Sequence, residues 1–363
     1  MKEGWEYKRF EDALEKVKYT KKLQTNEFLS EGRVPIISQE EDYISGFWNN
    51  PDDAYKVEKP IVIFGDHSRV IKYVDFDFVL GADGVKILKP IESLNAKFLY
   101  HYLKWYNVPN MGYSRHYKFL KEINMPVPPL KEQQQIVSEL DLLSGVIEKQ
   151  KAQLEELDKL AQSIFYNMFG DPVTNERGWI KSSIEEISVL RSGNSEANNS
   201  MPGKLPYVKV GDMNIEGNEF YIKTSSTFID KESNLKDIFP IGTTIFPKRG
   251  GAILTNKKRL TKLEICCDLN VMGVIPKKEL IDPLFLYFYF LRIDFKIFAK
   301  TGSAIPQINN YNIAPMSIGL PPLSLQQEFA AKIEAIEAMK AKVRQSLKEA
   351  ETLFNERMDY YFN

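Results

Sequence analysis

Two stretches of the chain carry apolar residues at alternating steps of three and four, the pattern of a long helix packed lengthwise on a partner helix. The first stretch, 126–169, opens with three prolines and meets its next turn signal at Gly170-Asp171-Pro172. Its seam consists of Ile136, Leu140, Leu143, Ile147, Leu154, Leu157, Ala161, Ile164 and Met168, with Gln150 as the one polar break. Since proline suits a position before a helix, the pattern predicts a helix of roughly 55–60 Å.

The second stretch, 319–362, repeats the opening motif and the apolar register of the first. Adding 193 to each residue number turns Pro128, Pro129, Leu130, Gln133 and Gln134 into Pro321, Pro322, Leu323, Gln326 and Gln327. The seam becomes Phe329, Ile333, Ile336, Lys340, Val343, Leu347, Ala350, Phe354, Arg357 and Tyr361. Two unrelated amphipathic helices would not be expected to share this opening and a constant offset, so the register indicates an internal duplication.

The regions before these helices contain short β-branched and aromatic runs separated by turns. In the first region we predict strands at 34–37, 61–64, 70–74, 76–80 and 85–88, and helices at about 10–17 and 96–105. The second region repeats this plan with a helix at 184–187, strands at 203–208 and 244–246, and a buried strand within 263–275. The offset between matching segments drifts, which is expected of two domains with one fold and loops of different length.

A PPL-x-x-QQ opening to a long helix, present twice and each time after a globular region, resembles the specificity subunit of type I restriction-modification enzymes. The resemblance covers essentially the whole chain. It implies two mixed α/β target-recognition domains, 1–127 and 171–320, and two helical spacers, 128–170 and 321–363, that pair as an antiparallel coiled coil with a pseudo-twofold repeat. Gly302 to Asn309 resembles the glycine-serine loop of that family, and 112–116 is its counterpart in the first domain.

The resemblance also implies a function and partners. The chain would read a bipartite target in double-stranded DNA and would dock methyltransferase subunits and ATP-dependent restriction/translocase subunits. S-adenosylmethionine, ATP and magnesium would belong to those partners, so this chain would need no cofactor and no metal of its own.

The net charge of −1 is unlike that of a small basic nucleic-acid binder, but the charges are unevenly distributed. Neither 93–121 nor 238–263 contains an acidic residue, and both are rich in lysine and arginine. One basic region in each half fits two separate phosphate contacts. A solvated basic face without a partner is the alternative for either region.

The motifs of an enzyme are missing from the sequence. Asn50-Pro51-Asp52 fails the Asn/Asp-Pro-Pro-aromatic motif of amino-methyltransferases, and no acid-x-Lys follows Asp52 within forty residues, as a nuclease would require. No G-x-G-x-x-G follows a strand, and the segment 250–257 is not a P-loop. The adjacent Cys266 and Cys267 cannot supply a zinc site alone. We therefore expect a non-catalytic subunit.

Arginine and lysine hold phosphates, whereas Arg, Asn, Gln and His on loops meet base edges. Loop position and charge, together with the loop placement of the family, select the candidate DNA contacts. They are His67, Arg69, Lys72, Arg115, His116 and Lys118 in the first domain, and Lys204, Lys209, Lys248, Arg249, Lys257, Lys258, Arg259, Gln307 and Asn309 in the second.

Two other classes of function stay open at this point. A coiled-coil scaffold could bind protein through its globular halves, which the nearly neutral charge allows. A methyltransferase fused to its recognition region would need motifs that the sequence lacks. No signal-peptide core stands in 1–10 and the apolar run 284–291 is too short to span a membrane, so we expect a cytoplasmic location.

Overall fold

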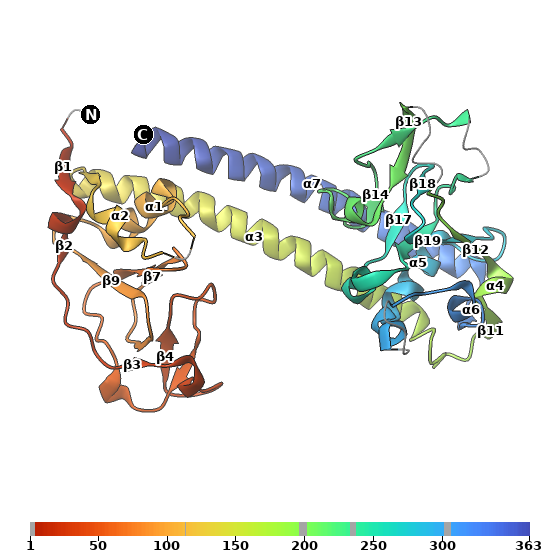
Figure 1. Cartoon of the computed structure of the whole chain (residues 1–363), viewed down its shortest axis with the longest axis horizontal. Coiled ribbons are helices and arrows are strands. Elements are labelled where there is room, and N and C mark those ends of the chain that lie inside the picture. Colours follow the sequence, from red (N-terminus) through yellow and green to blue (C-terminus); the bar gives the residue numbers. More distant parts are fainter. Residues whose placement is uncertain (1–3, 113, 196–201, 233–236, 301–305) are drawn as a thin grey trace. The chain divides into compact units, whose positions relative to one another are not determined.

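The computed structural model describes residues 4–112, 114–195, 202–232, 237–300 and 306–363 (Figure 1). The chain divides into two compact units. Unit 1 consists of Met1–Ala152 with Arg344–Asn363, and unit 2 consists of Gln153–Val343. Each unit therefore contains one globular domain and a part of both long helices.

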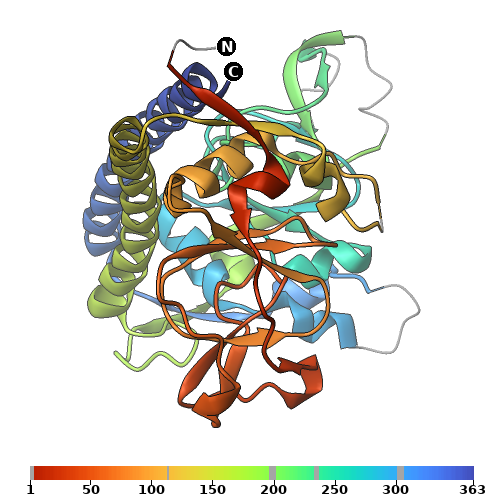
Figure 2. The ribbon, with the colours of Figure 1, turned by 90° about the vertical axis from the view of Figure 1, so that its left-hand side faces the viewer.

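Unit 1 has two four-stranded sheets, which face the viewer in Figure 2. The first sheet is antiparallel, in the order β2 (Leu14–Glu15), β9 (Val85–Pro90), β6 (Ile61–Gly65) and β7 (Ile71–Val74). The second has the order β3 (Lys22–Leu23), β8 (Val79–Gly81), β4 (Val34–Ile37) and β5 (Gly46–Trp48), and β8 runs parallel to both β3 and β4.

Alternation along β6 explains how these layers pack. Ile61 and Ile63 belong to the cluster that also contains Ile37 and Leu80 of the second sheet. The alternate residues Val62 and Phe64 belong to a different cluster, on the side of helix α1 (Ala96–Tyr106). Because successive side chains of a strand point to opposite faces, the fully buried β6 supplies both cores.

Helix α1 joins the domain of unit 1 to both long helices. Asn95 caps it by accepting hydrogen bonds from Lys97 N and Phe98 N at 2.8 and 3.2 Å. Its apolar side shares a core with Leu140 of α3 (Leu130–Phe169) and with Phe362 of α7 (Leu323–Phe362), and the ring centre of Phe362 lies 5.4 Å from that of Phe98. Burying each such side chain contributes about 1.5–3 kcal/mol, which fixes the domain on the helices.

Unit 2 repeats the same plan. Its larger sheet has the order β12 (Ser188–Ser192), β19 (Val271–Pro276), β16 (Thr244–Pro247), β17 (Arg259–Thr261) and β14 (Tyr221–Ile222). Its smaller sheet has the order β15 (Phe228–Ile229), β13 (Pro202–Val208) and β18 (Cys266–Cys267), with β13 and β18 parallel as β4 and β8 are. Helix α5 (Pro283–Arg292) takes the place of α1, and its Phe285 packs 4.8 Å from Phe169.

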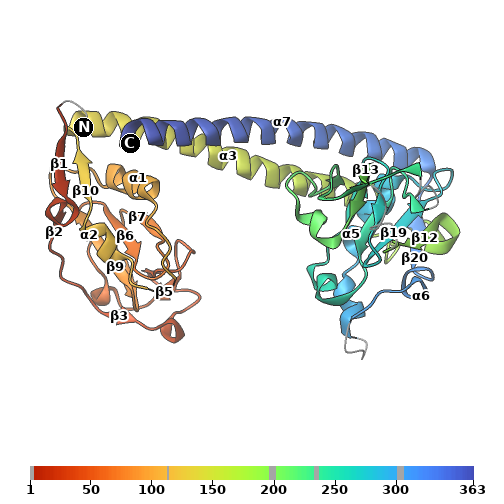
Figure 3. The ribbon, with the colours of Figure 1, turned by 45° about the horizontal axis from the view of Figure 1, so that its top comes forward.

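A pair of short strands closes each domain beside the start of a long helix. In unit 1, β1 (Glu6–Arg9) pairs with β10 (Asn124–Val127), and Figure 3 shows both at the beginning of α3. In unit 2, β11 (Ile180–Ser183) pairs with β20 (Ser317–Leu320). The short helices are α2 (Tyr117–Lys121), α4 (Ile184–Ile187) and α6 (Asn310–Ile313), with 3-10 turns η1 (Phe10–Ala13), η2 (Thr25–Glu27), η3 (Pro51–Asp53), η5 (Val210–Asn214), η7 (Gly250–Thr255) and η8 (Phe295–Lys300).

The long helices are α3 (Leu130–Phe169) and α7 (Leu323–Phe362), so the offset of 193 holds at both their first and last residues. In unit 1, Glu139 pairs with Arg357, and Gln150 Nε2 donates to Ser346 Oγ at 2.6 Å. In unit 2, Asp158 pairs with Lys340. As the residue number of the α3 partner rises from 139 to 158, that of its α7 partner falls from 357 to 340, which is the order expected of antiparallel helices.

The seam positions of both helices are all buried or half-buried. Ile136, Leu140, Phe329, Ile333 and Ile336 are fully enclosed, since they lie where the domains cover the helices. Leu143, Ile147, Leu154, Leu157, Ile164, Val343, Leu347 and Phe354 are half-buried, as expected where two helices shield each other on one side.

Three expectations about secondary structure need correction. The helix expected at about 10–17 is the turn η1 followed by β2, because Leu14 and Glu15 pair with Pro90 and Lys89 of β9. The buried strand expected within 263–275 is two strands, β18 and β19, which belong to different sheets. Asp268 Oδ1 accepts the N–H of Asn270 at 2.8 Å and so turns the chain between them. The strand expected at 76–80 begins only at Val79, because Phe78 forms an isolated bridge with Tyr55.

Candidate nucleic-acid interface

In unit 1, the turn between β6 and β7 meets the loop that precedes α2. The backbone N–H of His116 donates to Asp66 O at 2.8 Å, and Tyr117 N donates to the Asp66 carboxylate at 2.8 Å. These bonds bring His67 of the turn and the exposed Arg115 of the loop to one surface. We call this surface the turn–loop surface of unit 1 and define it as 65–69 with 114–118.

His116 organises this surface from inside, since its side chain is fully buried. Its Nε2 lies 3.3 Å from Met111 N and its Nδ1 lies 3.0 Å from Asp66 O. A backbone N–H can only donate and a carbonyl can only accept, so Nε2 carries the lone pair and Nδ1 carries the hydrogen. The neutral imidazole thereby holds the loop on the turn, and we leave His116 out of the proposed DNA contacts.

A polar cleft of about 630 Å³ lies beside the turn–loop surface of unit 1. Its lining consists of Lys22, Asp66, His67, Asp83, Gly84, Lys86, Ser114 and Arg115. Lys86 Nζ lies 3.5 Å from Asp66 Oδ2, so one of the two carboxylates is already paired. Basic groups therefore predominate in the lining, which suits an anionic ligand.

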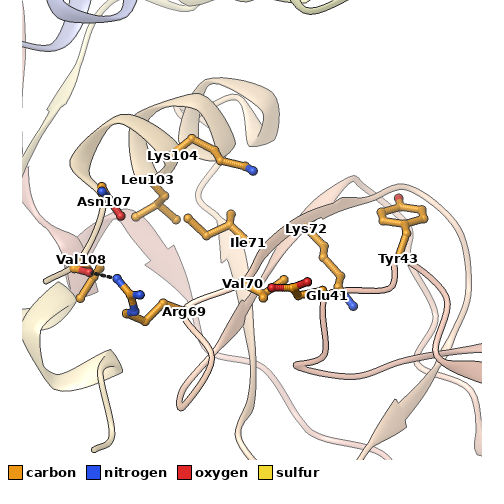
Figure 4. A pocket seen from close by; sticks show the side chains of 10 residues that line it. All are labelled: Glu41, Tyr43, Arg69, Val70, Ile71, Lys72, Leu103, Lys104, Asn107 and Val108. Atoms are coloured by element: carbon orange, nitrogen blue, oxygen red, sulfur yellow. Dashed lines mark hydrogen bonds between the residues drawn. The ribbon is translucent and has the colours of Figure 1, made fainter. Parts of the chain in front are cut away.

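Arg69 of this turn and Lys72 of strand β7 line a neighbouring cavity of about 380 Å³ (Figure 4). Arg69 has φ 63°, in the left-handed region, and its Nη1 donates to Val108 O at 2.9 Å. Lys72 is 3% exposed and donates to Ser38 O and Asp42 O at 3.0 and 2.5 Å. Burial lowers the pKa of Lys72. Its ammonium group holds the loop at 38–42, so we also leave it out of the proposed contacts.

Unit 2 forms the same junction from the matching elements. Ile308 N donates to Lys248 O at 2.8 Å, as His116 N donates to Asp66 O. Gly250 N donates to Pro306 O at 2.8 Å, and Arg249 and Gln307 form an isolated β-bridge. We call 247–250 with 306–309 the turn–loop surface of unit 2; the first part of its predicted glycine-serine loop, 302–305, lies outside the described residues.

Arg249 is exposed on this surface, whereas Gln307 and Asn309 are half-buried. Gln307 Nε2 donates to Asn309 Oδ1 at 2.7 Å. This bond fixes the orientation of the Gln307 carboxamide. Lys248 is 8% exposed and donates to Ser192 Oγ at 2.6 Å. Burial, with a smaller contribution from Arg249, lowers the pKa of Lys248. Its side chain holds Ser192 inside the domain, so we leave Lys248 out of the proposed DNA contacts.

The basic cluster at 257–259 is directed largely inward. Lys258 is 1% exposed, donates to Asn256 Oδ1 at 2.5 Å and to Ile293 O at 2.6 Å, and lies 4.2 Å from the ring centre of Phe295. Burial lowers its pKa to about 8. Arg259 donates to Lys258 O and Met213 O at 2.8 and 3.0 Å, and burial lowers its pKa as well. Lys257 is half-buried and bonds Asn214. Lys258 and Arg259 brace the domain and leave the proposed contact set.

The exposed candidates are Arg115, Lys118, Lys204 and Arg249, and Lys209 is half-buried. Sequence reasoning missed Lys22 and Lys86 beside the first surface and Lys104 in the cavity of Figure 4. The alternation of buried and outward-facing residues along a strand could have identified Lys86, which stands between the buried Val85 and Ile87 of β9.

Among the described residues, no group of three or more His, Cys, Asp or Glu could hold a metal ion. Nor does any helix in the described ranges have the length and apolarity needed to cross a bilayer.

Together, these features define a protein with two domains of one fold, each presenting a turn–loop surface with an exposed arginine, Arg115 or Arg249. A family model, described as "Type I restriction modification DNA specificity domain", matches residues 2–159 and again residues 176–351.

Two solved structures resemble the chain over nearly its whole length. The S subunit of a type I restriction-modification system from M. genitalium is 16% identical, with a TM-score of 0.65, and the match covers 99% of this chain and 96% of that one. A second solved structure, described as "Structural basis underlying complex assembly and conformational transition of the type I R-M system", is 14% identical with a TM-score of 0.54. The match covers 99% of this chain and 97% of that one. At these identities the likeness concerns the fold.

The chain belongs to the family of type I restriction-modification specificity subunits. Membership gives it a role in DNA specificity. The confirmed expectations are the resemblance itself and two mixed α/β domains with long helices.

Proposed function

We propose that the chain is the non-catalytic specificity subunit of a type I restriction-modification complex and reads a bipartite sequence in duplex DNA. The observation that carries this proposal is the occurrence of one turn–loop surface in each unit. Both surfaces are built by the same backbone bond, from His116 N to Asp66 O and from Ile308 N to Lys248 O. Two separate reading surfaces suit a target with two separate halves.

The exposed cations would set the position of each domain on DNA. Arg115 and Arg249 stand on the two surfaces with exposed side chains, and Lys22 and Lys86 line the cleft beside Arg115. Contacts of such groups with phosphates fix register, while a guanidinium can also bind a guanine edge with two hydrogen bonds. His67 and Arg69 in unit 1, and Gln307 and Asn309 in unit 2, are the proposed base-edge contacts. Lys118, Lys204, Lys209 and Lys257 are proposed phosphate contacts.

The four-part division predicted from the sequence is kept in this proposal. Residues 1–127 and 171–320 would be the recognition domains, and the helices within 128–170 and 321–363 would set the distance between the two half-sites. The seam of apolar residues supports pairing of the helices as a coiled coil. Methyltransferase and ATP-dependent restriction/translocase subunits are the proposed partners and would bring the chemistry and its cofactors.

A titration of DNA binding with salt tests the proposal. The full chain is mixed with duplexes of random sequence at several salt concentrations, with and without a type I methyltransferase subunit, and the bound sequences are read. We expect enrichment of a two-part sequence and an affinity that falls steeply with salt, since counterions are released from phosphates. Absence of sequence preference under both conditions would favour the alternative, a scaffold that binds protein through its globular halves.

A further inference from the structure

The opening PPL-x-x-QQ of each long helix contains a glutamine with an unusual environment. The side chain of Gln133 is fully buried at the start of α3. Its Nε2 donates to Pro128 O at 2.6 Å and to Ser93 O at 2.8 Å, and its Oε1 accepts from Asn95 N at 2.7 Å. Both hydrogens of the carboxamide and its oxygen are therefore engaged with the backbone of the domain and of the proline segment.

The same junction occurs in unit 2. Gln326 is fully buried at the start of α7, its Nε2 donates to Pro321 O at 2.8 Å, and its Oε1 accepts from Asp282 N at 2.8 Å. Asp282 caps α5 as Asn95 caps α1, by accepting from the N–H groups two and three residues onward. Each glutamine thus holds the residue at which the helix of its domain begins.

The second glutamine of the motif serves as an internal comparison. Gln134 and Gln327 follow directly in the sequence, yet both side chains are exposed. They share residue type, helix and motif with Gln133 and Gln326, and differ in that their side chains lie outside the junction. Matched substitutions at the two pairs therefore separate an effect of the junction from an effect on the helix.

We propose that Gln133 and Gln326 are positioning residues that fix the angle between each recognition domain and its long helix, and so determine which spacer length between two DNA half-sites is accepted. The proposal rests on the proposed function. A buried amide N–H or carbonyl without a partner is costly, so the carboxamide of Gln133 admits one arrangement of the two backbone segments that it bonds, 93–95 and Pro128. Replacement by alanine releases Asn95 and Asp282 and lets the domain turn on the helix.

The test uses the full chain, with the methyltransferase subunit where this is needed for binding. The target selected by the wild-type protein is prepared with its own spacer and with spacers one base pair shorter and longer. Affinities are measured for the double variant Gln133→Ala/Gln326→Ala and for the control Gln134→Ala/Gln327→Ala. We expect the preference of the double variant for the native spacer to fall about tenfold, the loss of roughly one net hydrogen bond, with unchanged half-site sequences. The control should retain the wild-type preference.

Other outcomes contradict the proposal. An unchanged spacer preference in the double variant, or an equal loss of affinity at all three spacers, shows that the junction does not position the domains. If the double variant does not fold, Gln133→Ala and Gln326→Ala are measured singly, and each is expected to weaken the spacer preference. A wild-type protein that selects no target would instead overturn the proposed function itself.

Discussion

At the scale of the residue, exposure separates cations that can meet DNA from cations that brace the fold. Lys257 and Lys258 are neighbours in one basic run, but Lys258 is buried against Phe295 and Lys257 is half-buried near Asn214. The sequence marks the run as basic and cannot say which side chain points inward, because that depends on the residues that η8 and η5 bring to it. Charge and loop position therefore predict a basic region but not which of its side chains are exposed.

Arg115 and Arg249 are expected to make the most direct contribution to DNA binding. Changing each to alanine should lower affinity about tenfold and make the slope of log affinity against log salt shallower by about one. The control is Lys342→Ala, which removes an equal charge from an exposed position on α7. Binding measured by fluorescence anisotropy over a salt series checks this. Equal effects of the arginine variants and the control would show that the turn–loop surfaces do not contact DNA.

Lys258 should reveal its burial in the pH dependence of stability. Its pKa of about 8 in the folded state lies below the ordinary value of 10.5. Between these values the unfolded chain binds the proton and the folded chain does not, so the free energy of unfolding rises with pH. We expect a rise of roughly 1–3 kcal/mol between pH 7 and 9.5 relative to Lys258→Met. Chemical denaturation at several pH values measures it, and parallel curves for the two proteins would refute the assignment.

At the scale of the element, the long helices were the most predictable part of the fold. The three prolines, the seam and the offset of 193 are local or periodic signals, and α3 and α7 begin and end at matching residues. The helix predicted at 10–17 was wrong because Leu14 and Glu15 pair with β9, which lies far along the chain. The sheet order and the division of 263–275 between two sheets were likewise set by distant partners.

A polar residue beside the seam of α3, Glu139, bonds two polar seam residues of α7 in unit 1. Glu139 accepts from Arg357 at 3.0 Å and from the Tyr361 hydroxyl at 2.5 Å. The hydrogen bond from Arg357, followed by that from Tyr361, holds the pKa of Glu139 below its ordinary value of 4.5. The stabilisation is therefore present above that value and is lost as pH falls through the lowered pKa.

A charge exchange tests this pairing. Glu139→Arg or Arg357→Glu alone should lower the midpoint of thermal unfolding by a few degrees, because like charges then face each other. The combination of both changes should restore most of the loss at pH 7. Differential scanning calorimetry measures the midpoints, and independent, additive losses in the double variant would show that the two side chains do not interact.

At the scale of the whole molecule, duplication explains why one chain carries two similar domains with different surfaces. The strand orders β9-β6-β7 and β19-β16-β17 agree, while the turn contributes His67 and Arg69 in one unit and Arg249 in the other. In the proposed function, a shared scaffold with altered loops would allow each domain to change its specificity separately. The account therefore predicts that recognition divides between the domains.

Exchange of one domain tests this claim most directly. Residues 1–127 are replaced by the corresponding region of another specificity subunit, and both proteins select their targets from a pool of random duplex DNA. The account predicts that one half of the selected sequence changes while the other half and the spacer length stay the same. A change in both halves, or in neither, would contradict it.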